Sequence, residues 1–346
     1  MERHDGHPGR DADDAGPDKV DAAPAHAGCC APVGRAVFAL QPAREGDTAV
    51  RLESSDDRHR IEQVSLPGGI FEMGNPFSDG FHADGETPVH PVELTPFTID
   101  ATSVTNADFA RFTESTGYVT EAESFDFSAV FHLVLAAEEG DILGQPPQTP
   151  WWYGVKGADW RHPEGRHSDI RTRADHPVVH VSWNDAQAYC AWAGRRLPTE
   201  AEWEFASRGG LTGARFPWGD ELLEADGSWQ VNIWQGVFPT ANTQDDGFLT
   251  TAPVRSYRPN AYGLWQTVGN VWEWCQDVFS PQTYSQDAGR GVVRDPRGPA
   301  SGGLRVMRGG SYLCHDSYCN RYRNAARSSN TPDSSMGNAG FRTVAA

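Results

Sequence analysis

The sequence predicts a single α+β domain with little regular secondary structure. Three capped helical segments lie between residues 105 and 210, and no long helix is indicated beyond Gly210. The 346 residues include 36 Gly, 24 Pro and 12 Trp, a composition typical of a loop-rich fold with large aromatic anchors. Because 38% of the residues are hydrophobic, the chain can still bury a substantial core. We expect this domain to span residues 63–346.

Residues 1–60 are predicted to form a disordered tail, because they combine low hydrophobicity with many charges and few aromatic side chains. The tail contains the thiol pair Cys29-Cys30, close to His26. A metal-capturing role for this pair stays open. A flexible segment that happens to contain two thiols is the simpler interpretation.

Two extended segments open the domain. The first covers residues 71–74 and the second covers residues 89–99. Residues 120–175 are expected to be loop-like, with Trp151 and Trp160 among their aromatic anchors. Loops of this length inside a compact domain are usually functional or held by metal ions.

Each of the three helices is predicted by its capping residues. A hydroxyl side chain can accept a hydrogen bond from the amide three positions on, and an acidic residue there can reach back. A glycine then ends each helix. The expected caps and ends are Thr105 and Gly117, Ser182 and Gly194, and Thr199 and Gly209.

The charge and hydropathy of the chain exclude several classes of partner. A formal net charge of -18 argues against nucleic acid or an anionic membrane surface. No apolar stretch approaches the length of a transmembrane helix, and the N-terminus lacks the apolar core of a signal peptide. We therefore expect a cytoplasmic protein, and we expect it to be a monomer. Structural disulfides are rare in that compartment, so a close cysteine pair indicates metal or redox chemistry.

Such a pair is formed by Cys314 and Cys319, in a polar and aromatic stretch. Their spacing permits a disulfide, although a purely structural one is disfavoured in the cytoplasm. A zinc site needs four ligands, and no second close Cys or Cys/His pair lies nearby in the sequence. Thiolates select Cu(I), which accepts two sulfur ligands and keeps an open position. The residues alone leave a copper site and a metal-free thiol–disulfide couple both open.

The order of several motifs resembles the formylglycine-generating enzymes, which are the sulfatase-modifying factors. The shared scaffold segments are PGGIFEMG (67–74), HPVVHVSW (176–183), GRRLPTEAEWE (194–204), NIWQG (232–236), GNVWEW (269–274) and GFR (340–342). These segments are common to a wider superfamily. A more specific match is residues 311–327 with both cysteines, followed by NTPDSS (330–335). This segment indicates the catalytic branch of the superfamily. The resemblance covers residues 63–346.

This resemblance implies a variant of the C-type-lectin-like fold with bound calcium. It also implies an oxygen-dependent conversion of the cysteine in a Cys-x-Pro-x-Arg motif of sulfatases to Cα-formylglycine. Cys314 and Cys319 are then the copper ligands, and the substrate thiolate joins them as a third ligand. An older view of the family assigns the same pair a metal-free redox role. Sequence alone does not separate the two.

The resemblance also implies roles for residues around the cysteines. Ser311 is expected to line the oxygen pocket and to donate a hydrogen bond there. Trp272 is expected to form a wall of the site. Ser335 and Asn338 are expected to face the same pocket from the C-terminal loop, although ordinary loop hydrogen bonding would also explain them.

Two structural calcium sites are implied in the same way. The expected ligands of the first are Asn232, the Ile233 carbonyl, Asp246 and the Phe248 carbonyl. The expected ligands of the second are Gln266, Glu273 and the carbonyls of Gly269 and Val271. Relatives usually have Asn where this chain has Gln266, which puts the second ion in question.

Two other functions fit the sequence less well. An iron-dependent sulfoxide synthase of the same superfamily needs a histidine cluster, usually on an added helical domain, and none precedes residue 63. A non-catalytic lectin-like module would leave the Cys314/Cys319 pair without a role. Relatives of the secretory pathway carry structural disulfides. Here Cys190 keeps one thiol, whereas Ser207, Asn324 and Thr343 stand at partner positions, which supports a cytoplasmic protein.

Overall fold

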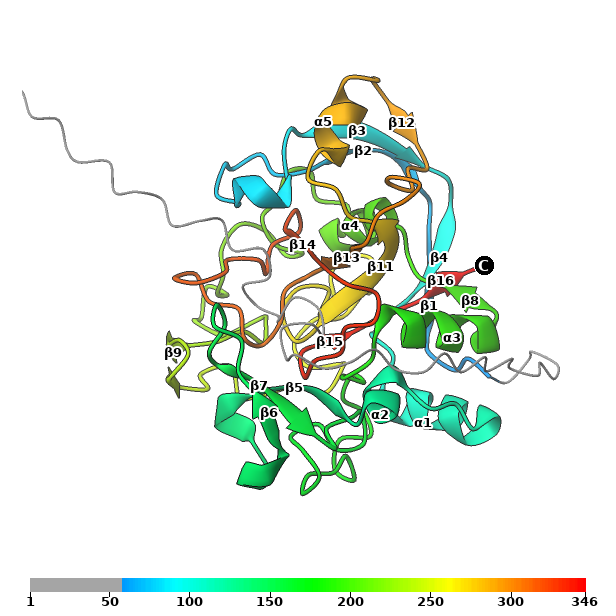
Figure 1. The fold of residues 1–346 in the computed structure, drawn as a ribbon. Helices are drawn as coiled ribbons and strands as arrows, with labels where there is room; N and C mark the ends of the chain where they lie inside the picture. The colour runs from blue at the N-terminus through cyan, green and yellow to red at the C-terminus, as the bar shows by residue number, and fades with distance from the viewer. Residues whose placement is uncertain (1–57) are drawn as a thin grey trace, which may run out of the picture.

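The structure is a computed structural model and describes residues 58–346. Five α-helices and five small sheets are arranged around one large core in this range (Figure 1). The longest strand has seven residues, and long loops connect most of the elements. The prediction of an α+β domain with little regular secondary structure is therefore confirmed. No helix in the described range is long and apolar enough to cross a membrane.

The central sheet has the strand order β14-β13-β11-β15. Its strands are β11 (Trp272–Val278), β13 (Arg305–Arg308), β14 (Arg327–Asn330) and β15 (Ala339–Gly340). The strands β13 and β14 pair antiparallel, with Arg308 opposite Arg327. Residues 309–326 therefore form one long hairpin loop, which we call the cysteine loop because it contains Cys314 and Cys319.

The other sheets surround this centre. The strands of the second four-stranded sheet are β1 (Gln63–Leu66), β4 (Phe97–Asp100), β16 (Val344–Ala345) and β8 (Arg195–Arg196). One three-stranded sheet contains β12 (Val293–Arg294), β3 (His90–Leu94) and β2 (Gly69–Met73). The other contains β5 (Phe127–Phe131), β7 (Trp152–Lys156) and β6 (Ile142–Gly144). The strands β9 (Gly236–Val237) and β10 (Ala241–Asn242) form a hairpin.

The three predicted helices are present with the predicted caps. They are α1 (Asn106–Thr116), α3 (Trp183–Ala193) and α4 (Glu200–Arg208). Each begins with a complete capping box, and each is followed by a glycine in the left-handed conformation, which a residue without Cβ adopts without strain. The only helix after α4 is α5 (Thr283–Ala288), so the expectation of no long helix beyond Gly210 is also confirmed for the described chain.

The prediction of a loop-like region over residues 120–175 is wrong in part. A short helix, α2 (Glu121–Phe125), begins at a capping box on Thr120, and the three strands β5, β6 and β7 follow. The strand β5 is buried along its whole length, so it lacks the polar–apolar alternation that identifies a half-exposed strand. Of the two anchors expected there, Trp160 is buried and Trp151 is partly exposed, while the neighbouring Trp152 is fully buried.

Residues 58–60 were predicted to belong to the tail, but they lie against the domain. The Arg58 side chain donates to the Trp192 carbonyl at 2.8 Å, and His59 Nε2 lies 2.7 Å from Asp100 Oδ1. The predicted tail over residues 1–57, with Cys29-Cys30, lies outside the described residues.

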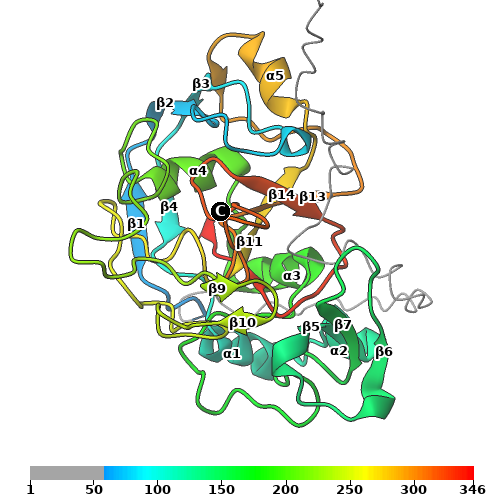
Figure 2. The same cartoon turned by 90° about the vertical axis from the view of Figure 1, so that its left-hand side faces the viewer.

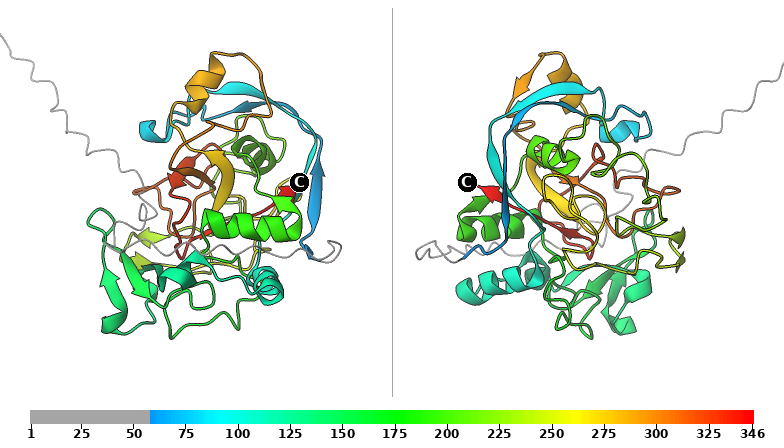
Figure 3. Two further views of the ribbon diagram at one scale, coloured as in Figure 1. Left: turned by 45° about the vertical axis from the view of Figure 1, so that its right-hand side comes forward. Right: turned by 180° about the vertical axis from the view of Figure 1, so that it is seen from behind.

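The elements divide the molecule into two ends with the central sheet between them. The strands β2 and β3 lie with α5 at one end, and the β5–β7–β6 sheet lies with α1 and α2 at the other (Figures 1 and 2). The helix α3 crosses between the central sheet and this second end (Figure 3). The large hydrophobic core connects the central sheet to this second end and includes both cysteines of the cysteine loop, whereas Met73, Val92 and Tyr284 of the first end belong to a separate cluster. The candidate site is therefore built into the middle of the molecule.

Candidate functional site

The base of the cysteine loop is fixed by a buried ion cluster. Arg308 and Arg327, which flank the loop, both bind Glu200 at the start of α4. Arg308 Nη1 lies 2.7 Å from Glu200 Oε1, and Arg327 donates to both carboxylate oxygens at 2.6 and 2.8 Å. Arg308 also donates to Glu204 at 2.6 Å. Since these groups are fully or nearly fully buried, the two ends of the loop are tied to one helix.

The second half of the loop is fixed to residues 79–86. Arg321 donates to both oxygens of Asp84 at 2.6 and 3.1 Å. Arg323 donates to both oxygens of Glu86 at 2.8 Å each. Paired hydrogen bonds of this kind fix the orientation of the arginine as well as its position. The segment directly after Cys319 is thus held by two buried ion pairs.

Both cysteines of the loop are fully buried and lie at the two ends of a tight turn. The His315 carbonyl accepts a hydrogen bond from the Cys319 amide at 2.8 Å, which closes the turn. Burial raises the pKa of Tyr322, and Asp316 and both cysteines raise it further, which indicates that both thiols lie near this hydroxyl. The four cysteines of the described residues are thiols, and none is in a disulfide.

A glycine makes room for the first sulfur. Gly310 has a φ of 72°, and a Cβ at this position would lie 2.7 Å from the Arg321 carbonyl oxygen. It would also lie 3.1 Å from Cys314 Sγ. Any side chain at residue 310 would therefore push against the thiol as well as strain the backbone.

Three of the other predicted site residues are joined to the first cysteine by hydrogen bonds. Asn338 Nδ2 donates to Ser311 Oγ at 2.9 Å, and the Ser311 amide donates to Cys314 Sγ at 3.4 Å. The Trp272 amide donates to the Asn338 carbonyl at 2.8 Å. Ser311 Oγ also accepts from the Leu313 amide at 3.3 Å, so two accepted bonds leave its own hydrogen to be donated elsewhere.

The last predicted site residue, Ser335, has different partners. Its Oγ lies 2.8 Å from Ser128 Oγ, and Ser128 Oγ lies 2.8 Å from His180 Nδ1. Ser335 is connected to the cysteine loop through its own loop, residues 335–338, which carries Asn338. Neither Ser128 nor His180 was identified from the sequence, because both lie far along the chain from the cysteines.

An aromatic cluster lies next to the second cysteine and was not predicted either. It consists of Trp151, Phe238 and Tyr318, which are all partly exposed. The rings of Phe238 and Tyr318 stack at 4.5 Å, and Trp151 meets Tyr318 edge-on at 4.8 Å. Tyr318 directly precedes Cys319, so its position was the one signal in the sequence for an apolar surface beside the thiols.

The residues of the first predicted calcium site lie together. The Ile233 amide donates to Asp246 Oδ2 and the Phe248 amide donates to Asp246 Oδ1, both at 3.0 Å. Burial raises the pKa of Asp246, and the buried Asn232 Oδ1 has no hydrogen-bond partner within the described chain. Gln235, which was not predicted, donates to Asp246 Oδ2 at 2.8 Å and contacts the Ile233 carbonyl. This group of hard oxygens fits a calcium ion.

In the second predicted calcium site, the carboxylate is already paired. Glu273 is fully buried, and its two oxygens accept four hydrogen bonds from Ser103, Trp203 and the guanidinium of Arg342. Its charge is therefore already neutralised and its lone pairs are occupied. Gln266 Nε2 donates to the Pro253 carbonyl at 2.6 Å, while its buried Oε1 has no hydrogen-bond partner within the described chain. A second calcium ion among Gln266, Gly269, Val271 and Glu273 therefore stays a prediction.

The positions that carry disulfides in secretory relatives are also informative. Ser207 Oγ donates to Asn324 Oδ1 at 2.8 Å, so a buried hydrogen bond joins these two positions. Cys190 is packed in the core, and burial raises the pKa of its thiol. It is an inert apolar residue here.

The comparisons with known proteins show the family of this chain. The family model described as a sulfatase-modifying factor enzyme 1-like domain matches residues 50–346. The chain belongs to the sulfatase-modifying factor family. The formylglycine-generating enzyme of Streptomyces coelicolor is 65% identical over 280 residues, which cover 81% of this chain and 88% of the relative. That of Thermomonospora curvata is 54% identical over 82% of this chain and 92% of its own length.

The predicted family and fold are therefore confirmed. Among solved structures, PvdO from Pseudomonas aeruginosa matches with a TM-score of 0.59 at 22% identity, over 87% of this chain and 99% of PvdO. At this identity the likeness supports the fold alone. A Bos taurus relative described as an inactive C-alpha-formylglycine-generating enzyme 2 is 44% identical over 82% of this chain and 87% of the relative.

Proposed function

We propose that this family member oxidises the cysteine of a Cys-x-Pro-x-Arg segment in a sulfatase to Cα-formylglycine, using molecular oxygen and a Cu(I) ion held by Cys314 and Cys319. The observation that carries the proposal is the buried thiol pair in a loop whose ends are fixed by ion pairs. No group of three or more His, Cys, Asp or Glu side chains gathers as a metal site among residues 58–346. Two sulfurs without a third ligand of these types suit Cu(I), which tolerates low coordination.

Bound Cu(I) would supply an open position for the substrate thiolate and electrons for the reduction of oxygen. The protein's own part is to hold the two thiols at a fixed separation and to exclude water from them. The arginine pairs of the loop do the first, and the surrounding hydrophobic core does the second. The Ser311 hydroxyl, whose lone pairs are occupied by Asn338 and Leu313, is oriented to donate a hydrogen bond into the pocket.

The aromatic cluster of Trp151, Phe238 and Tyr318 is the surface that we assign to the proline of the substrate. A proline ring is flat and apolar and packs well on aromatic faces. The stacked pair of Phe238 and Tyr318 provides such a face beside Cys319. The net charge of -18 favours the approach of an arginine-containing peptide.

The proposal is tested by peptide conversion. The protein is incubated with a synthetic Cys-x-Pro-x-Arg peptide, one equivalent of copper, air and a thiol reductant, which supplies the two electrons that oxygen needs beyond those of the substrate. Mass spectrometry should then show that the side chain –CH2SH has become –CHO, and a hydrazide probe should trap the aldehyde. A peptide with Ser in place of Cys is the matched control and should remain unchanged.

The same experiment separates the alternatives. An unchanged peptide with copper-loaded, folded protein would overturn the proposed reaction and favour a non-catalytic lectin-like module. A peptide that gains oxygen on sulfur would indicate sulfoxide chemistry instead. Full conversion in the presence of a strong Cu(I) chelator would support the metal-free thiol–disulfide mechanism. The inactive Bos taurus relative shows why this measurement is needed in addition to sequence identity.

We also propose that a structural calcium ion occupies the first site, held by Asn232, the Ile233 carbonyl, Asp246 and the Phe248 carbonyl. Removing the ion with a chelator should lower the melting temperature, because the carboxylate of Asp246 and Asn232 Oδ1 would lose their buried partner. Scanning calorimetry with and without calcium measures this shift. The Asp246→Asn variant should melt at a lower temperature and respond less to calcium, whereas the exposed Asp245→Asn control should behave like the wild type. No calcium-dependent shift in the wild type would contradict the site.

A further inference from the structure

His180 has an unusual conformation for a fully buried residue. Its φ is 60°, in the left-handed region that only a small share of residues other than Gly adopt. It lies between Val179 and Val181, in the segment that connects the strand β7 region to α3. Strained conformations of this kind persist only where the surrounding structure fixes them, and they are concentrated at functional sites.

The ring of His180 is held by two partners in a defined tautomer. Nε2 lies 2.8 Å from the Pro163 carbonyl and Nδ1 lies 2.8 Å from Ser128 Oγ. Burial lowers the pKa of His180 to about 4, so the ring is neutral at neutral pH and has one N–H group. A carbonyl oxygen only accepts hydrogen bonds, so this hydrogen is on Nε2. Nδ1 then carries a lone pair, and the Ser128 hydroxyl faces it at 2.8 Å.

The Ser128 hydroxyl connects this ring to Ser335. Ser128 Oγ donates to Ser335 Oγ at 2.8 Å, so its one hydrogen lies between two acceptors, the Ser335 oxygen and His180 Nδ1. Because the Ser335 oxygen accepts from Ser128, the hydrogen of the Ser335 hydroxyl is left to be donated elsewhere.

His180 also contacts the backbone of the same loop. Its amide donates to the Met336 carbonyl at 2.9 Å. A Cβ at Gly337 would lie 3.2 Å from His180 Nε2, so the loop packs closely on the imidazole ring. One buried residue thus holds three consecutive positions of loop 335–338: Ser335 through Ser128, Met336 through its carbonyl, and Gly337 by contact.

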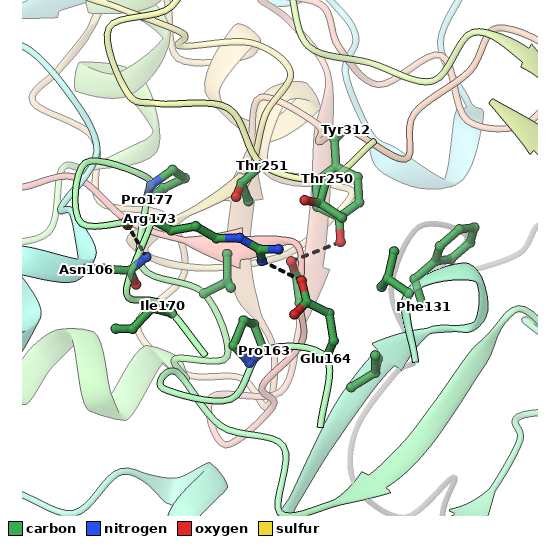
Figure 4. A pocket seen from close by; sticks show the side chains of 14 residues that line it. Asn106, Phe131, Pro163, Glu164, Ile170, Arg173, Pro177, Thr250, Thr251 and Tyr312 are labelled. Atoms are coloured by element: carbon green, nitrogen blue, oxygen red, sulfur yellow. Dashed lines mark hydrogen bonds and ion pairs between the residues drawn. The ribbon is translucent and has the colours of Figure 1, made fainter. Parts of the chain in front are cut away.

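The other end of this loop reaches the cysteines. The Tyr312 hydroxyl donates to the Gly337 carbonyl at 3.1 Å, and Figure 4 shows Tyr312 in the same pocket as Pro163 and the Glu164–Arg173 ion pair. Asn338 then donates to Ser311, whose amide contacts Cys314 Sγ. A continuous set of contacts therefore runs from His180 to the first thiol.

We propose that His180 is a positioning residue for the reaction at Cys314 and Cys319. It orients the Ser335 hydroxyl through Ser128 and holds loop 335–338 so that Asn338 keeps Ser311 in place. This role rests on the proposed function, since it concerns the geometry of that site. It differs from a purely structural role, which would affect the melting temperature without affecting turnover by folded protein.

The test compares kcat, KM, Cu(I) affinity and melting temperature among five variants: Ser128→Ala, Ser335→Ala, the double variant of both, His180→Asn and His180→Gln. Ser128→Ala should lower kcat about tenfold or more with unchanged Cu(I) affinity, because small misplacements of reacting groups are costly. The double variant should be no slower than Ser335→Ala alone, because Ser128 acts through Ser335. His180→Asn, whose amide can replace Nδ1, should keep more activity than His180→Gln.

Ser128→Ala removes the link without disturbing the left-handed backbone at residue 180, so it remains informative if the His180 variants fail to fold. A wild-type kcat in folded Ser128→Ala would overturn the proposal. Losses that multiply in the double variant would overturn it as well, because they would show independent roles. Weaker Cu(I) binding by Ser128→Ala would also contradict the proposal, because it would show that Ser128 affects the copper ligands and not only Ser335. A wild type that leaves the peptide unchanged would overturn the proposed function itself, before any variant is compared.

Discussion

Replacing either cysteine of the cysteine loop by serine is expected to abolish peptide conversion and tight Cu(I) binding while the protein stays folded. A hydroxyl is a hard, weakly acidic group and does not replace a thiolate as a ligand for Cu(I). The loop should keep its shape, because Arg308, Arg321, Arg323 and Arg327 hold it independently of the sulfurs. Cys314→Ser and Cys319→Ser should therefore melt within a few degrees of the wild type. The small decrease comes from the cost of burying a hydroxyl in place of a thiol.

Two measurements check this result. Titration against a competing chromophoric Cu(I) chelator gives the affinity and stoichiometry, and mass spectrometry gives the conversion of the peptide. Cys275→Ala is the matched control, because Cys275 is an equally buried thiol in β11. It should retain one tight Cu(I) site. Tight, stoichiometric Cu(I) binding that survives in both serine variants would rule out the assignment of the ligands.

The features that could be predicted from the sequence are those encoded by neighbouring residues. The helices α1, α3 and α4 were predicted because each cap and its acidic partner are three positions apart. The cysteine pair was visible for the same reason. By contrast, the strand β5 has no alternation to reveal it, because both of its faces are buried.

The features that the sequence did not reveal depend on contacts between distant segments. Ser128 and Ser335 are 207 positions apart, and Asp84 and Arg321 are 237 positions apart. No local pattern relates such residues, and each of them alone is an ordinary polar side chain. Glu273 differs from these residues, because its motif did suggest a role, that of a calcium ligand. In the fold its carboxylate forms a buried ion pair with Arg342, which the sequence did not reveal.

The largest loss of stability is expected from Glu200→Gln, which leaves two buried arginines at the base of the cysteine loop without their shared carboxylate. Burial alone would raise the pKa of Glu200, but Arg327 and Arg308 lower it, so the carboxylate is ionised in the folded protein. Breaking a buried ion pair from one side typically costs about 3–5 kcal/mol, because the remaining charge stays buried. Arg308 keeps Glu204, so Arg327 would carry most of this cost.

Urea denaturation gives the change in the free energy of unfolding, and the melting temperature should fall by roughly 6–15 °C, at about 2–3 °C per kcal/mol for a domain of this size. Glu62→Gln is the matched control, because its ion pair with Arg255 is exposed and should contribute at most about 1 kcal/mol. Because the cluster also fixes both ends of the loop, folded Glu200→Gln should bind Cu(I) more weakly than the wild type. If Glu200→Gln were as stable as Glu62→Gln, the loop would not depend on the cluster, and the cysteine separation would have to be fixed by the Arg321 and Arg323 pairs alone.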